Sequence, residues 1–261
     1  MPSRPTILVF ASGQDEGDAL ARRVRDVGFR PAVAKTPDAA RGIVEEPRFG
    51  VGAALLSTDL PVVDLTAALD GLRTRASSGR VEFVAIGARP DAAGVERLRE
   101  AGVSLGVWEP YPDAALRFQL NRALDDGTPP RDREAERVPI ARRARIVSGR
   151  FAKAATLYTL STGGAFIETP RPSPGGARVL LELVLPSCDV VVEGRVVYTN
   201  VTGNLRRANL PVGMGVVFHE PAPDAVRAIE ECVREATRCI TLEADPPQRE
   251  GWLQRLRLRR R

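Results

Sequence analysis

Lysine, histidine and aromatic residues are scarce in this sequence. Only Lys35 and Lys153 are lysines among 38 basic residues, so nearly all of the positive charge is guanidinium. The sequence has a single histidine, His219, and it contains no Ser/His/Asp order, metal-ligand cluster or phosphate-binding glycine loop. We therefore predict a protein that is not an enzyme, with no metal site and no cofactor.

Cysteine is also rare, since the chain has only Cys188, Cys232 and Cys239. An odd number of cysteines without metal-ligand spacing argues against both a disulfide framework and a zinc site. Cys232 and Cys239 are seven residues apart in a helical pattern, which favours small residues that face a core.

Long hydrophobic runs are missing from the start of the chain, where the apolar run 7–11 has only five residues. This run is too short for a secretory signal or a membrane span, so we expect a cytoplasmic protein.

Excess charge is confined to the end of the chain. The net charge is +5, and residues 249–261 hold six arginines against Glu250, which leaves residues 1–248 neutral. We therefore expect no DNA or RNA binding by the folded body. Residues 243–261 are predicted to be a disordered basic tail; the alternative is a short amphipathic segment that contacts an anionic membrane or protein surface.

Short apolar runs and helical patterns alternate five times between residues 5 and 125. Runs such as 81–86 are almost continuously apolar, which is typical of strands covered by helices on both faces. The first domain, 1–125, is therefore predicted to be an α/β fold with a doubly wound, five-stranded parallel sheet. The expected strands are 6–11, 30–34, 51–57, 81–87 and 105–108, and the expected helices are 17–27, 37–46, 65–75, 91–101 and 113–124.

This layout, with Leu60-Pro61 after the third strand and Glu109-Pro110 after the fifth, resembles a response-regulator receiver domain. The resemblance implies an aspartate as phosphoacceptor, and that position holds Ser57. It also implies acidic residues after the first strand, where the chain reads Phe10-Ala11-Ser12.

Two further receiver positions depart from the pattern. Gly87 replaces a hydroxyl residue, and Glu109 replaces a lysine. Without carboxylates to hold a divalent cation, phosphoryl transfer lacks both its nucleophile and its charge neutralisation. We predict an inert pseudo-receiver with no phosphoacceptor. The resemblance implies that the face formed by helix four, strand five and helix five contacts other proteins or a second copy of the chain.

Residues 126–138 are predicted to link two domains, because Pro129-Pro130 forbids continuation of the preceding helix. After the linker the pattern changes to six short strands, 140–147, 152–160, 165–169, 177–185, 190–200 and 209–218, followed by a helix at 221–239. The second domain, 139–242, is therefore predicted to be a small antiparallel β-barrel with a C-terminal helix.

The most informative motif begins in the linker. Arg133 and Arg137 are four residues apart, and a hydroxyl-rich turn containing Thr159, Ser161 and Gly163-Gly164 follows some twenty residues later. Guanidinium groups grip phosphates or guanine edges in bidentate fashion, hydroxyls add hydrogen bonds, and glycines allow a ligand to approach the backbone.

Together with the segments 191–197 and 213–218, this order resembles a PilZ domain, the bacterial receptor module for cyclic di-GMP. The PilZ ligand motif is R-x-x-x-R followed by [D/N]-x-S-x-x-G. Arg133, Arg137, Ser161 and Gly164 match it, whereas Thr159 stands where the family has Asp or Asn. The resemblance implies that these residues, with Gly163, bind cyclic di-GMP, and that Thr159 weakens the affinity.

Two functions remain open at this stage. The first is a signalling receptor in which cyclic di-GMP, bound at the barrel, changes how the pseudo-receiver meets an unidentified protein partner. The second is an adapter that binds no nucleotide and acts in protein assembly, for instance in motility or polarity regulation.

Overall fold

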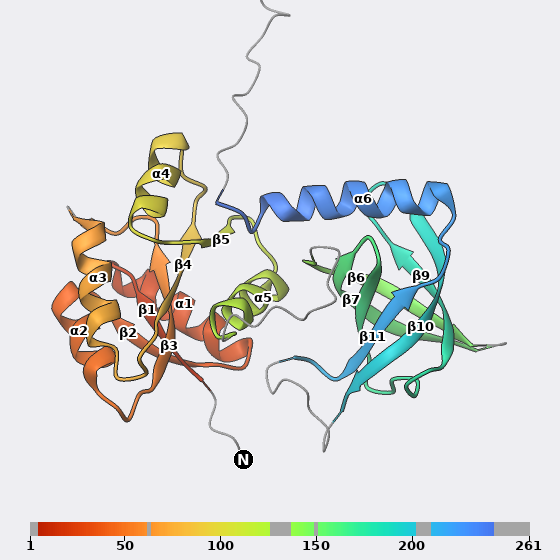
Figure 1. Cartoon of the computed structure of the whole chain (residues 1–261), viewed down its shortest axis with the longest axis horizontal. Coiled ribbons are helices and arrows are strands. Elements are labelled where there is room, and N and C mark those ends of the chain that lie inside the picture. The colour runs from red at the N-terminus through yellow and green to blue at the C-terminus, as the bar shows by residue number, and fades with distance from the viewer. Residues whose placement is uncertain (1–4, 62–63, 126–136, 149–150, 202–209, 243–261) are drawn as a thin grey trace, which may run out of the picture.

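Five parallel strands form an open sheet in the first half of the chain, and six antiparallel strands close into a barrel in the second half (Figure 1). The computed structural model describes residues 5–61, 64–125, 137–148, 151–201 and 210–242. Both parts of the predicted fold class are confirmed. Within the described residues, no helix is long and apolar enough to span a membrane.

The sheet has the strand order β2-β1-β3-β4-β5, with every neighbouring pair parallel. Its strands are β1 (Thr6–Phe10), β2 (Arg30–Ala34), β3 (Val51–Ser57), β4 (Glu82–Gly87) and β5 (Leu105–Trp108). The intervening helices are α1 (Gln14–Asp26), α2 (Pro37–Glu45), α3 (Leu65–Arg75), α4 (Ala92–Glu100) and α5 (Asp113–Ala123).

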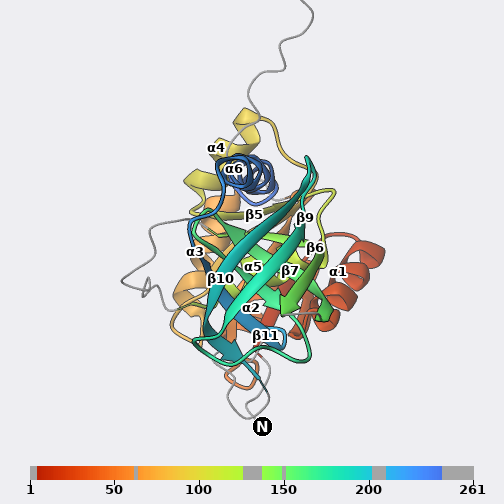
Figure 2. The same ribbon diagram turned by 90° about the vertical axis from the view of Figure 1, so that its right-hand side faces the viewer.

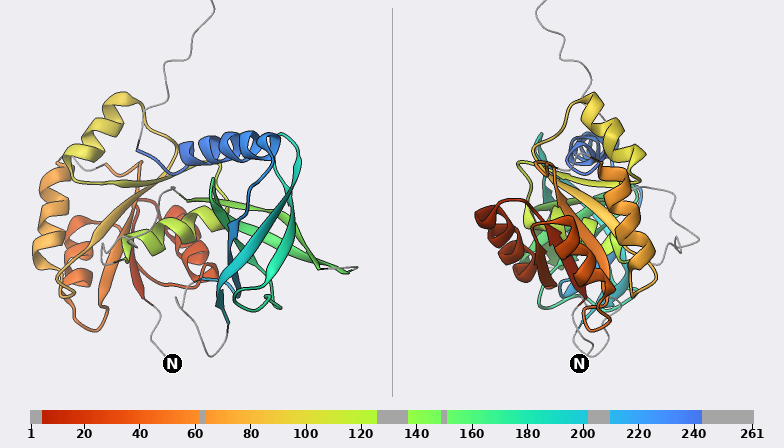
Figure 3. Two further views of the ribbon diagram at one scale, coloured as in Figure 1. Left: turned by 45° about the vertical axis from the view of Figure 1, so that its right-hand side comes forward. Right: turned by 90° about the vertical axis from the view of Figure 1, so that its left-hand side faces the viewer.

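Helices cover both faces of this sheet, as the apolar strands require (Figures 1 and 3). Ile7 and Val9 of β1 belong to the same apolar cluster as α1 and α5, while Leu8 and Phe10 belong to a second cluster with α2, α3 and α4. Successive side chains of a strand point to opposite faces, so one strand serves both cores.

Local hydrogen bonds fix where three of the helices begin. The side chains of Thr36, Asp64 and Asp91 each accept from the backbone N–H three residues further on, at the starts of α2, α3 and α4. Such N-terminal caps stabilise a helix by about 1 kcal/mol each.

The barrel closes in the order β10-β11-β8-β7-β6-β9 (Figure 2). Its strands are β6 (Val138–Ser148), β7 (Phe151–Ser161), β8 (Gly164–Glu168), β9 (Arg178–Val184), β10 (Asp189–Asn200) and β11 (Gly213–Phe218). Burial alternates along β9 and β10, which is the pattern of strands with one face in a core and one face in solvent. Strand β6 begins at Val138, the last residue of the expected linker; the rest of that segment up to residue 136 lies outside the described residues.

Helix α6 (Pro223–Arg238) lies along the barrel and extends toward the sheet (Figures 1 and 2). Its buried residues are Ala225, Ala228, Ile229 and Cys232, which form one apolar face against β6, β7 and β10. Cys232 is therefore a core residue, as its spacing predicted, while Cys239 at the end of the helix is half-buried.

The segment that follows α6 binds the first domain. The backbone N–H of Trp108 on β5 donates to the carbonyl of Cys239 at 3.0 Å, and its indole N–H donates to the carbonyl of Thr241 at 2.6 Å. The fully buried amide of Gln119 on α5 donates to the carbonyls of Gly106 at 2.8 Å and Ile240 at 2.7 Å.

Helix α4 joins the same arrangement, since Arg99 donates to the carbonyl of Leu242 at 2.6 Å. Helix α4, strand β5 and helix α5 form the face that was expected to contact other proteins. In this structure, part of that face is covered by residues 239–242 of the same chain.

Replacing Gln119 with leucine should loosen this covering segment. The variant keeps the volume of the side chain but leaves two buried carbonyls without their donor, so we expect a loss of about 1–3 kcal/mol in unfolding free energy. Denaturant unfolding measures the loss, and amide hydrogen exchange should become faster at residues 239–242.

Gln14→Leu, at an exposed glutamine of α1, is the matched control and should change stability little. Unchanged stability and exchange in Gln119→Leu would show that the amide does not hold the segment.

Candidate functional site

The hairpin between β7 and β8 brings several motif residues together. Val138, the first residue of β6, pairs with Leu160 near the end of β7, so Arg137 precedes the strand at the same end of the β6–β7 pair. Ser161 in turn pairs with Gly164 across the two-residue turn. Ser161 and Gly164 thus lie on adjacent strands close to the start of β6, which Arg137 precedes, whereas Arg133 lies outside the described residues.

The predicted ligand groups at this hairpin already have structural partners. The hydroxyl of Ser161 is 4% exposed and donates to the carbonyl of Gly164 at 3.1 Å, which closes the turn. The carbonyl of Gly163 accepts from the N–H of Phe218 at 3.0 Å and so ties the turn to the end of β11.

Gly164 is required by packing between strands. A Cβ atom at this position would lie 2.3 Å from the carbonyl oxygen of Val216 and 3.3 Å from the Cα of Val217. Gly163 has open space around the same position. The glycine that matches the motif therefore permits the close approach of β8 to β11, a role that the sequence pattern alone did not separate from ligand approach.

Thr159 lies on β7 between Pro139 of β6 and Phe166 of β8, with 5% of its surface exposed. The pairing of β7 with β8 shifts between Leu157 and Thr159, so Tyr158 is the extra residue of a β-bulge. The extra residue reverses the face of the sheet to which the following side chains point. The alternating pattern of the sequence did not predict this reversal.

These observations describe a barrel whose β7–β8 hairpin pairs a serine with a glycine, close to an arginine that precedes β6. Residues 131–235 match the family model of the PilZ domain. The chain contains a PilZ domain. PilZ domains generally bind cyclic di-GMP and are typical signalling modules.

Solved structures similar to this chain include several receiver domains. The chemotaxis protein CheY4 of Vibrio cholerae is 11% identical with a TM-score of 0.41, and the match covers 47% of this chain and all of that protein. The receiver domain of a sensor histidine kinase from Pseudomonas aeruginosa is 23% identical with a TM-score of 0.41, over 47% of this chain and 98% of that one.

An inhibitor of motility from Bacillus subtilis is 18% identical with a TM-score of 0.35, over 42% of this chain and 56% of that one. A comparison with curated proteins found no match. The receiver-like fold of the first domain is established by its strand order, β2-β1-β3-β4-β5, which is that of CheY-like sheets.

Ser57, where the receiver resemblance led us to expect a phosphoacceptor, is 4% exposed at the end of β3. Its hydroxyl donates to the carboxylate of Glu16 on α1 and accepts from the N–H of Asp59 at 3.2 Å. Sequence reasoning missed Glu16, because it lies beyond the 10–12 segment where a receiver carries its acidic residues. In the described part of the chain, no three His, Cys, Asp or Glu residues are grouped so that they could hold a metal ion.

An aromatic row on the outside of the PilZ domain contacts the receiver-like domain. The ring of Phe166 packs edge-on against Tyr158 and at a tilt against Tyr198, with centroids 6.0 Å apart in both pairs. Ala114 of α5 belongs to the same apolar cluster, and the guanidinium of Arg117 lies 5.8 Å from the centre of the Tyr158 ring. Sequence patterns could not assign this contact, because the three aromatic residues lie on three different strands.

Burial raises the pKa of Tyr158 to about 12 from an ordinary value of 10.0, although the nearby positive charge of Arg117 opposes the shift. Its hydroxyl is buried and makes no hydrogen bond of standard geometry among the described residues, although the guanidinium of Arg117 lies close to it. The contact between the domains therefore favours the neutral phenol.

Substituting Gly163 and Gly164 one at a time should distinguish the glycine that strand packing requires from the one that tolerates a side chain. Gly164→Ala places a methyl group against a backbone carbonyl, so we expect a loss of about 1–3 kcal/mol in unfolding free energy. Gly163→Ala should change stability by less than about 0.5 kcal/mol, because its methyl group points into open space. Denaturant unfolding of both variants checks this, and equal stability would contradict the packing role of Gly164.

Alkaline pH should weaken the contact at Tyr158. Because the folded-state pKa is raised, the unfolded chain releases this proton first as the pH rises. The stabilisation is complete below pH 10.0 and is lost as the pH rises to about 12. Unfolding free energies measured across this range should fall more steeply for the wild type than for Tyr158→Phe, whose stability at neutral pH should be equal or higher because it lacks the unpaired hydroxyl. Parallel curves for the two proteins would contradict this origin of the shift.

Proposed function

We propose that the PilZ domain binds cyclic di-GMP at the β7–β8 hairpin and that binding changes how the receiver-like domain lies against the barrel. The observation that carries the proposal is the strand register, which pairs Val138, the residue after Arg137, with Leu160 and pairs Ser161 with Gly164. A guanidinium at this position can grip a phosphate or the O6 and N7 atoms of guanine. The family match over residues 131–235 supports the same ligand.

Arg133 and Arg137 would hold the nucleotide from the linker side. Thr159 and Ser161 would bind it from the hairpin through their hydroxyls, and the backbone of Gly163 and Gly164 would lie against it. Thr159 lacks the carboxylate or amide oxygen that the family has at this position, so its hydroxyl would be a weaker acceptor for a guanine edge.

Coupling to the first domain would follow from the position of Tyr158. This residue precedes Thr159 on the bulged part of β7 and packs near Ala114 of α5. A ligand that ordered the neighbouring backbone or drew the linker arginines toward the hairpin would act on this contact. The ligand would then select one arrangement of the two domains over others.

The receiver-like domain would serve as a protein-binding module without phosphorylation. Its phosphoacceptor position holds Ser57, whose hydroxyl is bonded to Glu16. Its partner would be another protein. Residues 239–242, which cover part of the face formed by α4, β5 and α5, would control the access of this partner to that face.

A second function, an adapter that binds no nucleotide, is favoured by a specific observation. Thr159 and Ser161 are 5% and 4% exposed, and the Ser161 hydroxyl is already bonded within the turn. In such a protein, the barrel would act as a rigid spacer, and the contacts with other proteins would be independent of cyclic di-GMP.

Isothermal calorimetry with cyclic di-GMP distinguishes the two functions. Arg137→Ala should cost about 1–3 kcal/mol of binding free energy, or roughly ten to a hundredfold in affinity, because a bidentate contact is lost. Arg143→Ala, at an exposed arginine on β6, is the matched control and should bind as the wild type does.

The double variant Arg133→Ala/Arg137→Ala should show no measurable binding. Equal affinity in this variant and the wild type would exclude the arginine pair as the ligand clamp. No heat with the wild type, together with a protein partner recovered equally with and without cyclic di-GMP, would support the adapter.

A further inference from the structure

A second pair of arginines lies on the same outer face of the barrel as the hairpin. Arg178 on β9 is directly opposite Arg195 on β10. Arg195 is opposite Val217 on β11, and Val217 is opposite Gly164 on β8. A single cross-strand row therefore runs from the predicted ligand hairpin to the arginine pair, and strand spacing places Arg195 about 10 Å from Gly164.

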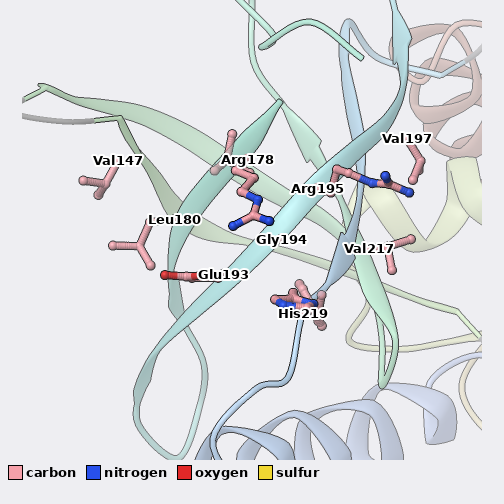
Figure 4. A pocket seen from close by; sticks show the side chains of 11 residues that line it. Val147, Arg178, Leu180, Glu193, Gly194, Arg195, Val197, Val217 and His219 are labelled. Carbon is pink, nitrogen blue, oxygen red and sulfur yellow. The ribbon is translucent and has the colours of Figure 1, made fainter. Parts of the chain in front are cut away.

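The arginine pair lines a pocket of about 550 Å³ between β9, β10 and β11 (Figure 4). Figure 4 shows Arg178 and Arg195 on neighbouring strands, with His219 at the end of β11 nearby. The pocket also contains one carboxylate, that of Glu193. Glu193 is paired across the strands with Leu180, and it forms no salt bridge with either arginine.

Among the described residues, neither Arg178 nor Arg195 has an acidic partner or a side-chain hydrogen bond. Another arginine on the same barrel does: Arg145 on β6 is opposite Glu182 on β9, and their side chains form a salt bridge of 2.8 Å. Like charges directly opposite each other on neighbouring strands destabilise a sheet. The uncompensated pair thus costs stability, which an anion bound in the pocket would offset.

Apolar surface separates the hairpin from the arginine pair. Val217 is 46% exposed and Val197 is 44% exposed, and both line the pocket. A flat ring can lie against such side chains while a negative group reaches the arginines. The row therefore has the two features of a nucleotide site, an apolar platform and a cluster of bidentate cation donors.

We propose that Arg178 and Arg195 form an anion subsite that binds a phosphate of a purine nucleotide extended along this row from the β7–β8 hairpin. The assignment rests on the proposed binding of cyclic di-GMP. It adds a contact on β9 and β10 to the motif residues on β6, β7 and β8.

Calorimetric titration with cyclic di-GMP tests the subsite in the full-length protein. Arg178→Ala and Arg195→Ala should each weaken binding by about tenfold, since each removes a charge-assisted hydrogen bond. The double variant should also depend less steeply on salt, because fewer cations neutralise the ligand. Arg234→Ala, at an exposed arginine of α6, is the control and should bind as the wild type does.

Thermal unfolding separates this role from a structural one. Removing one of two opposed like charges should leave the melting temperature unchanged or higher, even as affinity falls. A double variant that binds cyclic di-GMP with wild-type affinity, while Arg137→Ala loses affinity, would overturn the subsite and leave the proposed function intact.

If the wild type shows no heat with cyclic di-GMP, the proposed function fails, and titration with inorganic pyrophosphate decides the subsite separately. Pyrophosphate binding that is lost in Arg178→Ala/Arg195→Ala would support an anion site at this pair. No pyrophosphate binding by the wild type, or equal binding by both proteins, would overturn it.

Discussion

The amide of Gln119 is the interaction on which the arrangement of the two domains depends. This side chain is fully buried and donates both to the backbone of β5 and to the segment after α6. A buried donor that lost one of these carbonyls would be costly to leave unpaired, so the sheet and the end of α6 are held in one geometry. The aromatic contact between Tyr158 and α5 also connects the two domains.

The two contacts differ in their chemistry. The contact at Gln119 consists of backbone carbonyls and fixed donors, which tolerate little displacement. The contact at Tyr158 is apolar, with an unpaired hydroxyl and a guanidinium at its edge. Apolar contacts lack directional constraint, so the aromatic surface next to the ligand hairpin is better suited to rearrangement than the hydrogen-bonded one.

Much of the fold could be predicted from the sequence, because each element carries its own local pattern. The run 81–86 is apolar throughout and forms β4 in the middle of a covered sheet, and the spacing of Cys232 within a helical pattern placed it in the core. Non-local features could not be predicted. The bulge at Tyr158 and the packing of residues 239–242 on β5 depend on residues far apart in the chain.

The candidate site shows the same division. Arg137, Ser161 and Gly164 could be selected from the spacing of a motif, but the spacing does not reveal that the Ser161 hydroxyl closes the turn or that Gly164 faces a carbonyl of β11. No motif connects Arg178 with Arg195 of the segment 191–197, because their proximity arises only from strand pairing. The site can therefore be recognised only when the register of the paired strands is known.

The backbone bond from Trp108 to Cys239 has a consequence for the first domain considered alone. Strand β5 is an edge of the parallel sheet, and an uncovered edge offers unsatisfied donors and acceptors to any other chain. Residues 239–242 shield this edge, although they come after the barrel in the sequence. A fragment cut at the linker would lack that shield and would expose the indole of Trp108. Residues 239–242 therefore complete the fold of the first domain.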